Sequence, residues 1–243
     1  MKDLSTFIDE LIAAHSDRRT FEPAGLIPST VDEAYAVHEA LMEALGPVEG
    51  FKISQKPNRP PVVAPIPNSR CLPSGAQLDG PTKTKVEVEL GFVVFDVIPD
   101  PGDADFRRRL MSAVRPAPMI EIVASRLEGA HADDPMAKLA DLQSCEALIF
   151  GSADEEWSGS EFDEVQVELN CDGAIVSEGL GKIPAGTAYD ALERTVIELG
   201  HRFGGLQVGQ KLLTGSLLSP IEMTAGHRLN GRIKGLSGVT VDL

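Results

Sequence analysis

The sequence lacks any long hydrophobic run. Its apolar stretches all fall short of the roughly 20 residues that a membrane-spanning helix needs. The N-terminal segment carries acidic residues inside its apolar stretch, unlike a secretory signal peptide. Cysteine is also scarce, and Cys71, Cys145 and Cys171 show no Cys-x-x-Cys spacing, which argues against a disulfide framework and against a structural zinc site. We therefore expect a cytoplasmic protein.

The sequence also has few basic residues. The 243-residue chain has 22 Lys and Arg residues against 37 Asp and Glu residues, a formal net charge of −15 at pH 7. Such a surface should repel nucleic acid and anionic membranes. The phosphate-binding motifs GxGxxG and GxxxxGKS are missing too, so nucleotide-binding folds receive no support. A small anionic substrate is compatible with this charge, because a metal ion or a few cations can reverse the field inside a cleft.

What is present is a series of helix and strand periodicities. Apolar residues three and four apart predict helices, and alternating or short apolar runs predict strands. Prolines crowd the segment 57–73, which we expect to be an extended, stiff loop. The order favours an α+β protein with a curved mixed sheet. Helices are expected at 4–12, 30–45, 104–114 and 187–203, and strands at 83–90, 119–123, 147–150, 165–176 with an Asp-Gly turn, 211–213, 228–233 and 239–241.

Three glutamates in predicted strands need an explanation. Glu87 and Glu89 are two residues apart, so both side chains leave one face of their strand, and for such a pair alone a solvated face is the commoner explanation. Glu121 stands in an apolar run, where a free carboxylate is costly. A partner such as Arg126 or Arg115, or a wet edge strand, would explain it equally well. Together the three could form an all-oxygen site that suits Mg²⁺ or Mn²⁺ and leaves about three positions for water or substrate.

Zinc suits this sequence less well, because the histidines are scattered without ligand spacing and are expected on the surface or on helix faces. They are His15, His38, His131, His201 and His227.

Lys52 lies in a short apolar strand expected at 48–54, just before the proline-rich loop. A lone lysine there commonly extends to solvent. Facing a cleft, it would instead supply positive charge for a carboxylate or an enolate.

Five segments in register resemble the 2-keto-4-pentenoate hydratase / 4-oxalocrotonate decarboxylase family of the fumarylacetoacetate hydrolase superfamily. The resemblance runs from about Thr30 to the C-terminus, and five motifs in this order are hard to obtain by chance. They are GFKI (50–53), VEVELGFVV (86–94), PMIEIVASR (118–126), LTGSL (213–217) and GLSGVTV (235–241).

The resemblance implies an α+β fold in which a mixed β-roll catalytic domain over 48–243, with an inserted helix at 187–203, forms one structural unit with a helical N-terminal region over 1–47. It implies a Mg²⁺ or Mn²⁺ cofactor, a small anionic 2-oxo acid substrate from aromatic compound catabolism, and homo-oligomers, either pentamers or decamers. Its metal ligands map onto Glu87, Glu89 and Glu121, its catalytic residues onto Lys52 and Ser144, and its substrate-binding residues onto Lys52, Thr214 and Ser216.

The sequence also departs from the family pattern. An acid that follows the lysine strand in the hydratases has no counterpart in the segment 61–65, and Leu142 follows Asp141 where the family has asparagine. Glu146 stands where the family has glycine. It is a candidate substitute acid, although a solvated glutamate is the commoner outcome.

These observations predict a metal-dependent lyase. Hydration of a 2-keto-4-enoate ranks first, and decarboxylation of a 2-oxo-enedioate is the alternative, because both reactions need the same electron sink. Because these residues depart from the family pattern, a binding protein without activity is a further alternative. A C–C bond hydrolase would need a His–acid base, for which His38, on a helix face, is the candidate. Without the resemblance, the fallback is an α+β protein with an acidic surface patch.

Overall fold

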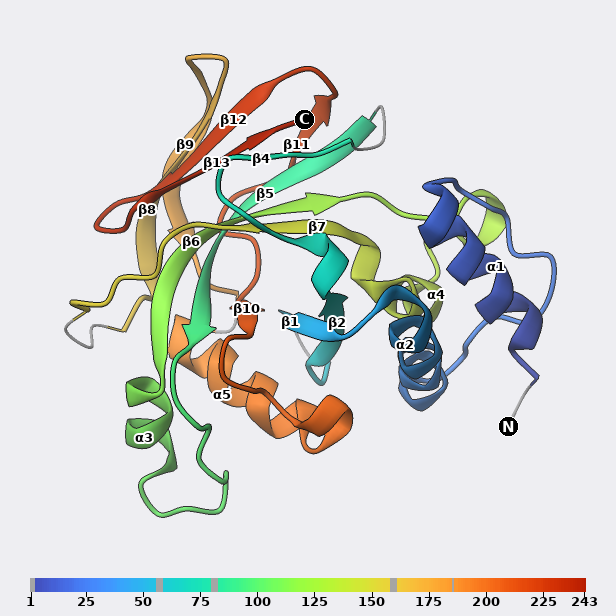
Figure 1. Ribbon diagram of the computed structural model, residues 1–243, viewed down its shortest axis with the longest axis horizontal. Helices are drawn as coiled ribbons and strands as arrows, with labels where there is room; N and C mark the ends of the chain where they lie inside the picture. Colours follow the sequence, from blue (N-terminus) through green and yellow to red (C-terminus); the bar gives the residue numbers. More distant parts are fainter. Residues whose placement is uncertain (1–2, 56–58, 80–82, 158–160, 185) are drawn as a thin grey trace.

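Two β-sheets form the centre of the computed structural model (Figure 1). The model describes residues 3–55, 59–79, 83–157, 161–184 and 186–243. The larger, eight-stranded sheet has the order β2-β1-β10-β5-β6-β7-β3, with β11 paired to β5, and it mixes parallel and antiparallel neighbours. Its strands are β1 (Val48–Ser54), β2 (Val62–Pro67), β3 (Cys71–Pro73), β5 (Lys83–Val94), β6 (Val114–Val123), β7 (Cys145–Phe150), β10 (Lys211–Leu213) and β11 (Ile221–Thr224).

The second sheet has five strands in the order β4-β13-β12-β8-β9. Asp172 and Gly173 join β8 to β9, and both have positive φ, 51° and 91°. Asp-Gly favours this backbone geometry, so the hairpin predicted from the sequence is confirmed. The strands are β4 (Ala76–Gln77), β8 (Glu164–Cys171), β9 (Ala174–Lys182), β12 (Arg228–Ile233) and β13 (Gly238–Asp242).

Strand β5 has one apolar and one polar face. Its even-numbered residues from Val86 to Val94 are buried in the main hydrophobic core, which also contains Leu229 of the five-stranded sheet. Because successive side chains alternate between the faces of a strand, Glu87 and Glu89 leave the opposite face. The packing of the two sheets therefore determines where the glutamates point.

The helices lie at the margins of the sheets (Figure 1). Helices α1, α2 and α4 share a second hydrophobic cluster. The Thr30 side chain accepts a hydrogen bond from the backbone of Glu33 and so caps α2, and Thr187 with Asp190 forms a capping box on α5. The helices are α1 (Ser5–Asp17), α2 (Val31–Leu45), α3 (Phe106–Ser112), α4 (Pro135–Ala140) and α5 (Ala188–Leu199), with 3₁₀ turns η1 (Asn68–Arg70), η2 (Gly129–His131), η3 (Leu142–Ser144) and η4 (Arg202–Gly204).

The proline-rich segment is only partly the loop that the sequence predicts. Residues 56–58, which include Pro57, lie outside the described residues. From Val62 onward the chain forms β2 and then β3, which take the two ends of the sheet order. Proline fits a strand at the edge of a sheet, where its missing N–H is not needed. The prediction was right to exclude a central strand and wrong to expect a loop where the chain forms β2 and β3.

Besides β2 and β3, three short helices or strands, β4, α4 and β11, have no counterpart in the sequence prediction. Each has six residues or fewer, too short for a helical or alternating pattern to stand out. Across the part of the chain that the structure describes, none of the helices has the length and apolar character needed to cross a membrane.

Candidate metal and substrate site

The three glutamates come together on adjacent strands. In the antiparallel β5–β6 pair, Glu87 lies directly opposite Glu121, and Glu89 lies opposite Met119. One carboxylate oxygen from each glutamate lies within 4.8 Å of the other two. Residues directly opposite in a sheet have neighbouring side chains, so the register itself brings like charges together.

Two of the three glutamates are buried and Glu87 is half-buried, and the cluster holds a carboxylate oxygen without a partner among the described residues. Glu121 is 0% exposed and Glu89 is 2% exposed. Burial, and after it the charge of Glu121, raises the pKa of Glu87 and raises that of Glu89 further. Glu121 Oε2 has no hydrogen-bond partner among the described residues. An oxygen donor set with an unsatisfied buried oxygen fits a hard divalent cation such as Mg²⁺ or Mn²⁺.

Glu121 does have a cationic partner, Lys52, but not the arginines or the wet edge strand that the sequence offered as alternatives. Glu89 and Glu121 do not lie on a solvated face, because both are buried. Glu121 is not on an edge strand, since β6 lies between β5 and β7. Arg126 pairs with Glu146, and Arg115 donates to backbone carbonyls of Ser112 and Val114.

Lys52 supplies a positive charge at this cluster. Its side chain, 8% exposed, reaches from β1 and forms an ion pair with Glu121, and Nζ also donates to the Gln143 carbonyl at 3.4 Å. Burial lowers the pKa of Lys52, but Glu121 and other neighbours outweigh burial and raise it overall. The ammonium group therefore stays charged and does not extend to solvent. One lysine leaves three carboxylates only partly neutralised.

The loop 214–216 lies against the same glutamates. Gly215 N donates to Glu89 Oε2 at 2.8 Å, and the Ser216 side chain is near enough to Glu87 to lower its pKa, although its hydroxyl donates to the Leu218 carbonyl at 2.6 Å. Gly215 has a φ of 107°, which only glycine adopts readily. Thr214 is buried, and its hydroxyl donates to the Leu90 carbonyl at 2.6 Å. The two residues assigned to substrate binding thus lie beside the cluster, with Thr214 bonded to the backbone.

A strained turn adjoins Lys52. Leu142, Gln143 and Ser144 have φ values of 50°, 54° and 60°, in the left-handed region. Non-glycine residues held there persist only where the surroundings enforce them, often at functional sites. The turn directs the Gln143 carbonyl to the Lys52 ammonium and positions Ser144, 8% exposed, between two cavities.

A buried network of charged side chains flanks this turn. Asp141 pairs with His15 of α1 at 3.1 Å and accepts a hydrogen bond from the Arg126 backbone at 2.9 Å. Arg126 contacts Glu146 at 3.0 Å, and Glu146 also pairs with Arg70. Asp141 precedes the turn and Glu146 follows it, so the network holds the chain on both sides of the turn. Glu146 is therefore neither solvated nor free to act as the substitute acid. Sequence reasoning missed the network because His15 and Arg70 are far along the chain from the other three members.

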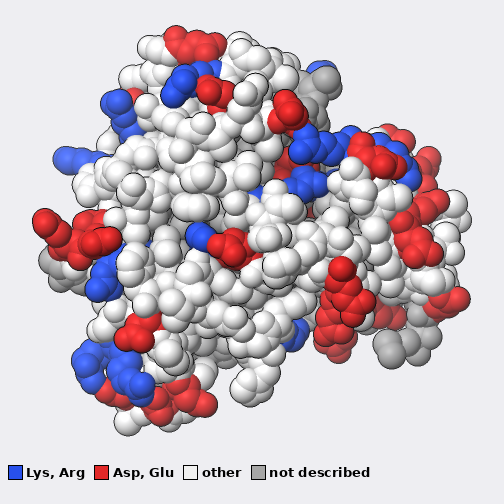
Figure 2. All heavy atoms as spheres, in the orientation of Figure 1, with Lys and Arg blue, Asp and Glu red and all other residues white. Residues whose placement is uncertain are grey.

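The two cavities that meet at Ser144 differ in character. One, of about 690 Å³, is lined by Lys83, Lys85 and Lys138 as well as Glu222 and Asp133. The other, of about 560 Å³, has a more apolar lining that includes Val62 and Leu139. On the face shown in Figure 2, Lys and Arg side chains gather between the start of β5 and helices α1 and α4.

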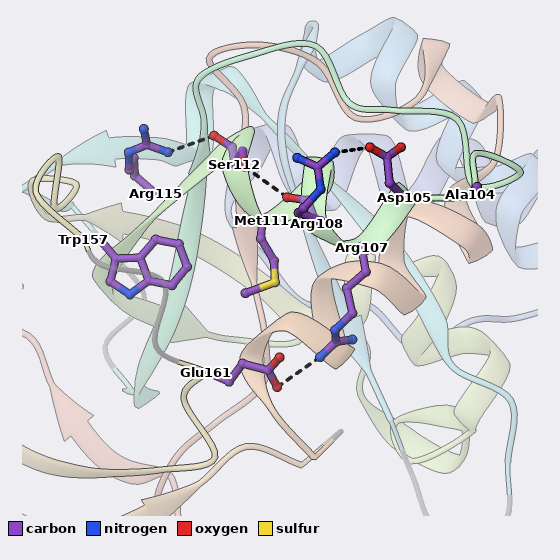
Figure 3. Close-up of a pocket in the computed structure, with 9 residues that line it drawn as sticks. All are labelled: Ala104, Asp105, Arg107, Arg108, Met111, Ser112, Arg115, Trp157 and Glu161. Atoms are coloured by element: carbon purple, nitrogen blue, oxygen red, sulfur yellow. Dashed lines mark hydrogen bonds and ion pairs between the residues drawn. The ribbon is translucent and has the colours of Figure 1, made fainter.

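A further cavity of about 690 Å³ beside α3 does not adjoin the glutamates (Figure 3). Its arginines are already paired. Arg107 contacts Glu161, Asp190 and Glu193 at 2.7–3.1 Å, and Arg108 pairs with Asp105. These contacts connect α3 to α5 and to the segment before β8, so we interpret the cluster as structural.

Several solved structures share this fold. No family model matches the chain. A 4-oxalocrotonate decarboxylase from Pseudomonas putida G7, complexed with magnesium and adipate, superposes with a TM-score of 0.78 at 20% identity, covering 98% of this chain and 95% of that one. Fumarylpyruvate hydrolase from Pseudomonas aeruginosa, in complex with Mn²⁺ and pyruvate, gives 0.55 at 14% identity, with 82% and 90% covered. A fumarylacetoacetate hydrolase family protein from Yersinia pestis CO92 gives 0.56 at 13%, with 81% and 92% covered.

These matches define the class of fold. The chain has the mixed α+β fold of fumarylacetoacetate hydrolase-type proteins, and the agreement over nearly its whole length is with a 4-oxalocrotonate decarboxylase. At the level of the fold, the resemblance inferred from the sequence is confirmed.

Removing one carboxylate should relieve the repulsion in the metal-free protein. We expect Glu87→Gln to raise the melting temperature of chelator-treated protein by about 2–4 °C, the shift that about 1 kcal/mol produces in a chain of this size. The same variant should lose most of the stabilisation that Mn²⁺ gives the parent protein. Thermal unfolding with and without metal measures both effects. Glu155→Gln, at an exposed position, is the control, and equal metal stabilisation in parent and Glu87→Gln proteins would contradict this account.

Proposed function

We propose that this protein is a divalent-metal-dependent lyase that acts on a small 2-oxo acid in the breakdown of aromatic compounds. The observation that carries the proposal is the cluster of Glu87, Glu89 and Glu121, in which a buried Glu121 oxygen has no partner among the described residues. The cluster offers only oxygen donors, so Mg²⁺ or Mn²⁺ is the proposed cofactor. Solved proteins of the same fold were crystallised with magnesium and adipate or with Mn²⁺ and pyruvate, which supports this choice.

In this proposal, each residue around the substrate has a separate role. A bound divalent ion supplies Lewis-acid polarisation of the carboxylate and 2-oxo oxygens of the substrate. Lys52 adds positive charge on the same side and offsets the substrate carboxylate. Ser144, at the junction of two cavities, is the proposed proton relay. Ser216 and Thr214 form the loop beside the glutamates that we propose to face the substrate carboxylate.

The cavity linings favour the second of the two predicted reactions. Lys85 lies on the same face of β5 as Glu87 and about 7 Å along the strand. With Lys83 it brings two ammonium groups to one cavity, in which Lys138 is already paired with Asp133 at 2.6 Å. A 2-keto-4-enoate has a single carboxylate, at its metal-binding end, whereas a 2-oxo-enedioate has a second carboxylate that these lysines could bind. Decarboxylation of a dicarboxylate is therefore the candidate that we favour over hydration, which the sequence ranked first.

Glu121→Gln tests the metal hypothesis. The variant removes one charge from a buried site without changing its shape, so the protein should fold. We expect its metal-dependent turnover of a 2-oxo acid to fall at least about 100-fold, since even groups that only orient metal ligands are worth 10–100-fold. Steady-state kinetics with added Mn²⁺ measures the loss, and far-ultraviolet circular dichroism checks the fold.

Two results would count against this function. Full activity of Glu121→Gln in the presence of a chelator would exclude a metal mechanism. If the parent protein binds Mn²⁺ and oxalate in calorimetry but turns over none of a panel of 2-oxo acids, it is the binding protein without activity that the altered residues also allow.

Lys85→Gln tests the choice between substrates. It should raise the KM for a 2-oxo-enedioate by about tenfold, equivalent to about 1.4 kcal/mol, and leave the KM for a 2-keto-4-enoate unchanged. Lys234→Gln, at an exposed position outside the lysine-lined cavity, is the matched control. An equal effect of Lys85→Gln on both substrates would contradict a role in binding the second carboxylate.

We also propose that the chain forms a homo-oligomer, a pentamer or decamer by the family resemblance. Strand β9 ends the order of the five-stranded sheet and exposes Ile175, Val176 and Leu180 by 41–58%. Apolar side chains on an open sheet edge are typical of an interface between chains. Light scattering coupled to size exclusion should give a mass of five or ten chains, and Leu180→Lys should lower it. A monomeric parent protein would contradict the proposal.

A further inference from the structure

A second group of metal-binding side chains lies on the five-stranded sheet, away from the three glutamates. Cys171 ends β8, Asp172 begins the hairpin turn, and His227 directly precedes β12. One sulfur, one carboxylate oxygen and one imidazole nitrogen from these residues lie within 4.8 Å of one another. This mixed donor set suits Zn²⁺, whereas the all-oxygen set of the glutamates suits Mg²⁺.

The sheet fixes the backbone positions of these residues. Cys171 pairs with Leu229 in the β8–β12 ladder. The Asp172 backbone N–H donates to the Arg228 carbonyl at 3.0 Å, and the Arg228 N–H donates to Asp172 Oδ1 at 2.9 Å. Because Oδ1 is held in this way, Oδ2 is directed to His227 Nδ1, 2.7 Å away. Such a bond to the second oxygen is the kind of support that orients a metal-binding carboxylate.

The spacing of the side-chain atoms is close to that of a tetrahedral site. Asp172 Oδ2 is 2.7 Å from His227 Nδ1 and 3.9 Å from Cys171 Sγ. Zinc bond lengths of about 2.0–2.3 Å place tetrahedral ligand atoms about 3.3–3.6 Å apart. Shifts of less than about 1 Å would therefore produce the geometry. His227 and Asp172 are 40% and 52% exposed, so their side chains have room to move and water can fill a fourth position.

We propose that Cys171, Asp172 and His227 form a second divalent-metal site, of the zinc class. The ion connects the β8–β9 turn to the start of β12 and so holds the edge hairpin on the five-stranded sheet. Metal binding removes the thiol proton, which is released to solvent. The site is independent of the proposed lyase activity. No sequence pattern indicates this site, because His227 is 55 positions from Asp172.

Cobalt titration of the whole chain tests this site. The protein is stripped with a chelator, kept reduced with a non-chelating phosphine, and titrated with Co²⁺. A cysteine-bound Co²⁺ has a thiolate-to-metal charge-transfer band that oxygen ligands cannot produce. We expect one such band, with an intensity that corresponds to one thiolate-bound Co²⁺ per chain, and we expect Zn²⁺ to displace it. Zinc should also raise the melting temperature, because a ligand that binds only the folded state stabilises it.

Single substitutions identify the ligands. Cys171→Ser and His227→Gln should each abolish the band and weaken Zn²⁺ binding about tenfold or more. His201→Gln, at an exposed histidine, is the matched control and should keep the band, as should Glu121→Gln. Circular dichroism checks that each variant folds. If Cys171→Ser does not fold, the result with His227→Gln decides the outcome.

Two outcomes would overturn the proposal. One is the absence of a thiolate band in the parent protein. The other is a band that survives Cys171→Ser and disappears in Glu121→Gln, which would assign the thiolate to Cys145, a residue that lies close enough to Glu121 for their charges to interact.

Discussion

The concentration of negative charge between β5 and β6 is the constraint to which the rest of the site responds. Glu87 faces Glu121 across the ladder, although like charges in that position oppose pairing. The register persists because a shift of one residue would turn Val86 and its even-numbered neighbours out of the main core. Core packing therefore overrides the repulsion, and the charge is met locally by Lys52 and by the Gly215 amide.

This balance explains how a protein with a net charge of −15 could hold an anionic substrate. With the proposed divalent ion bound, three carboxylates, the ion and Lys52 would sum to about zero charge, and the site would not carry the negative charge of the surface. Lys83 and Lys85, at the start of β5, add positive charge on the same face of the strand. The two lysines thus follow the glutamate cluster along one strand face, so one carboxylate of a dicarboxylate would bind at the proposed metal ion and the other would lie near Lys83 and Lys85.

The sequence predicted those parts of the molecule that depend on local pattern. Alternation along β5 located Glu87 and Glu89 on one face, and the apolar context of Glu121 indicated a buried acid. The pairing of Lys52 with Glu121 could not be predicted, because β1 and β6 meet the same site only through the sheet order β1-β10-β5-β6. The edge strands β2 and β3 were missed because their prolines favour a loop in a sequence-based prediction. The Cys171 cluster was missed because His227 is far along the chain from Cys171 and Asp172.

The left-handed turn at 142–144 shows why the helices matter for the site. Three successive non-glycine residues with positive φ cost roughly 1–3 kcal/mol each, so the turn needs external support. That support comes from Asp141, buried against His15 of α1, and from Glu146, held by two arginines. Removing one member of such a network leaves the others as unpaired buried charges. The position of the Gln143 carbonyl at Lys52, and of Ser144 between its cavities, therefore depends on a helix more than 120 residues earlier in the chain.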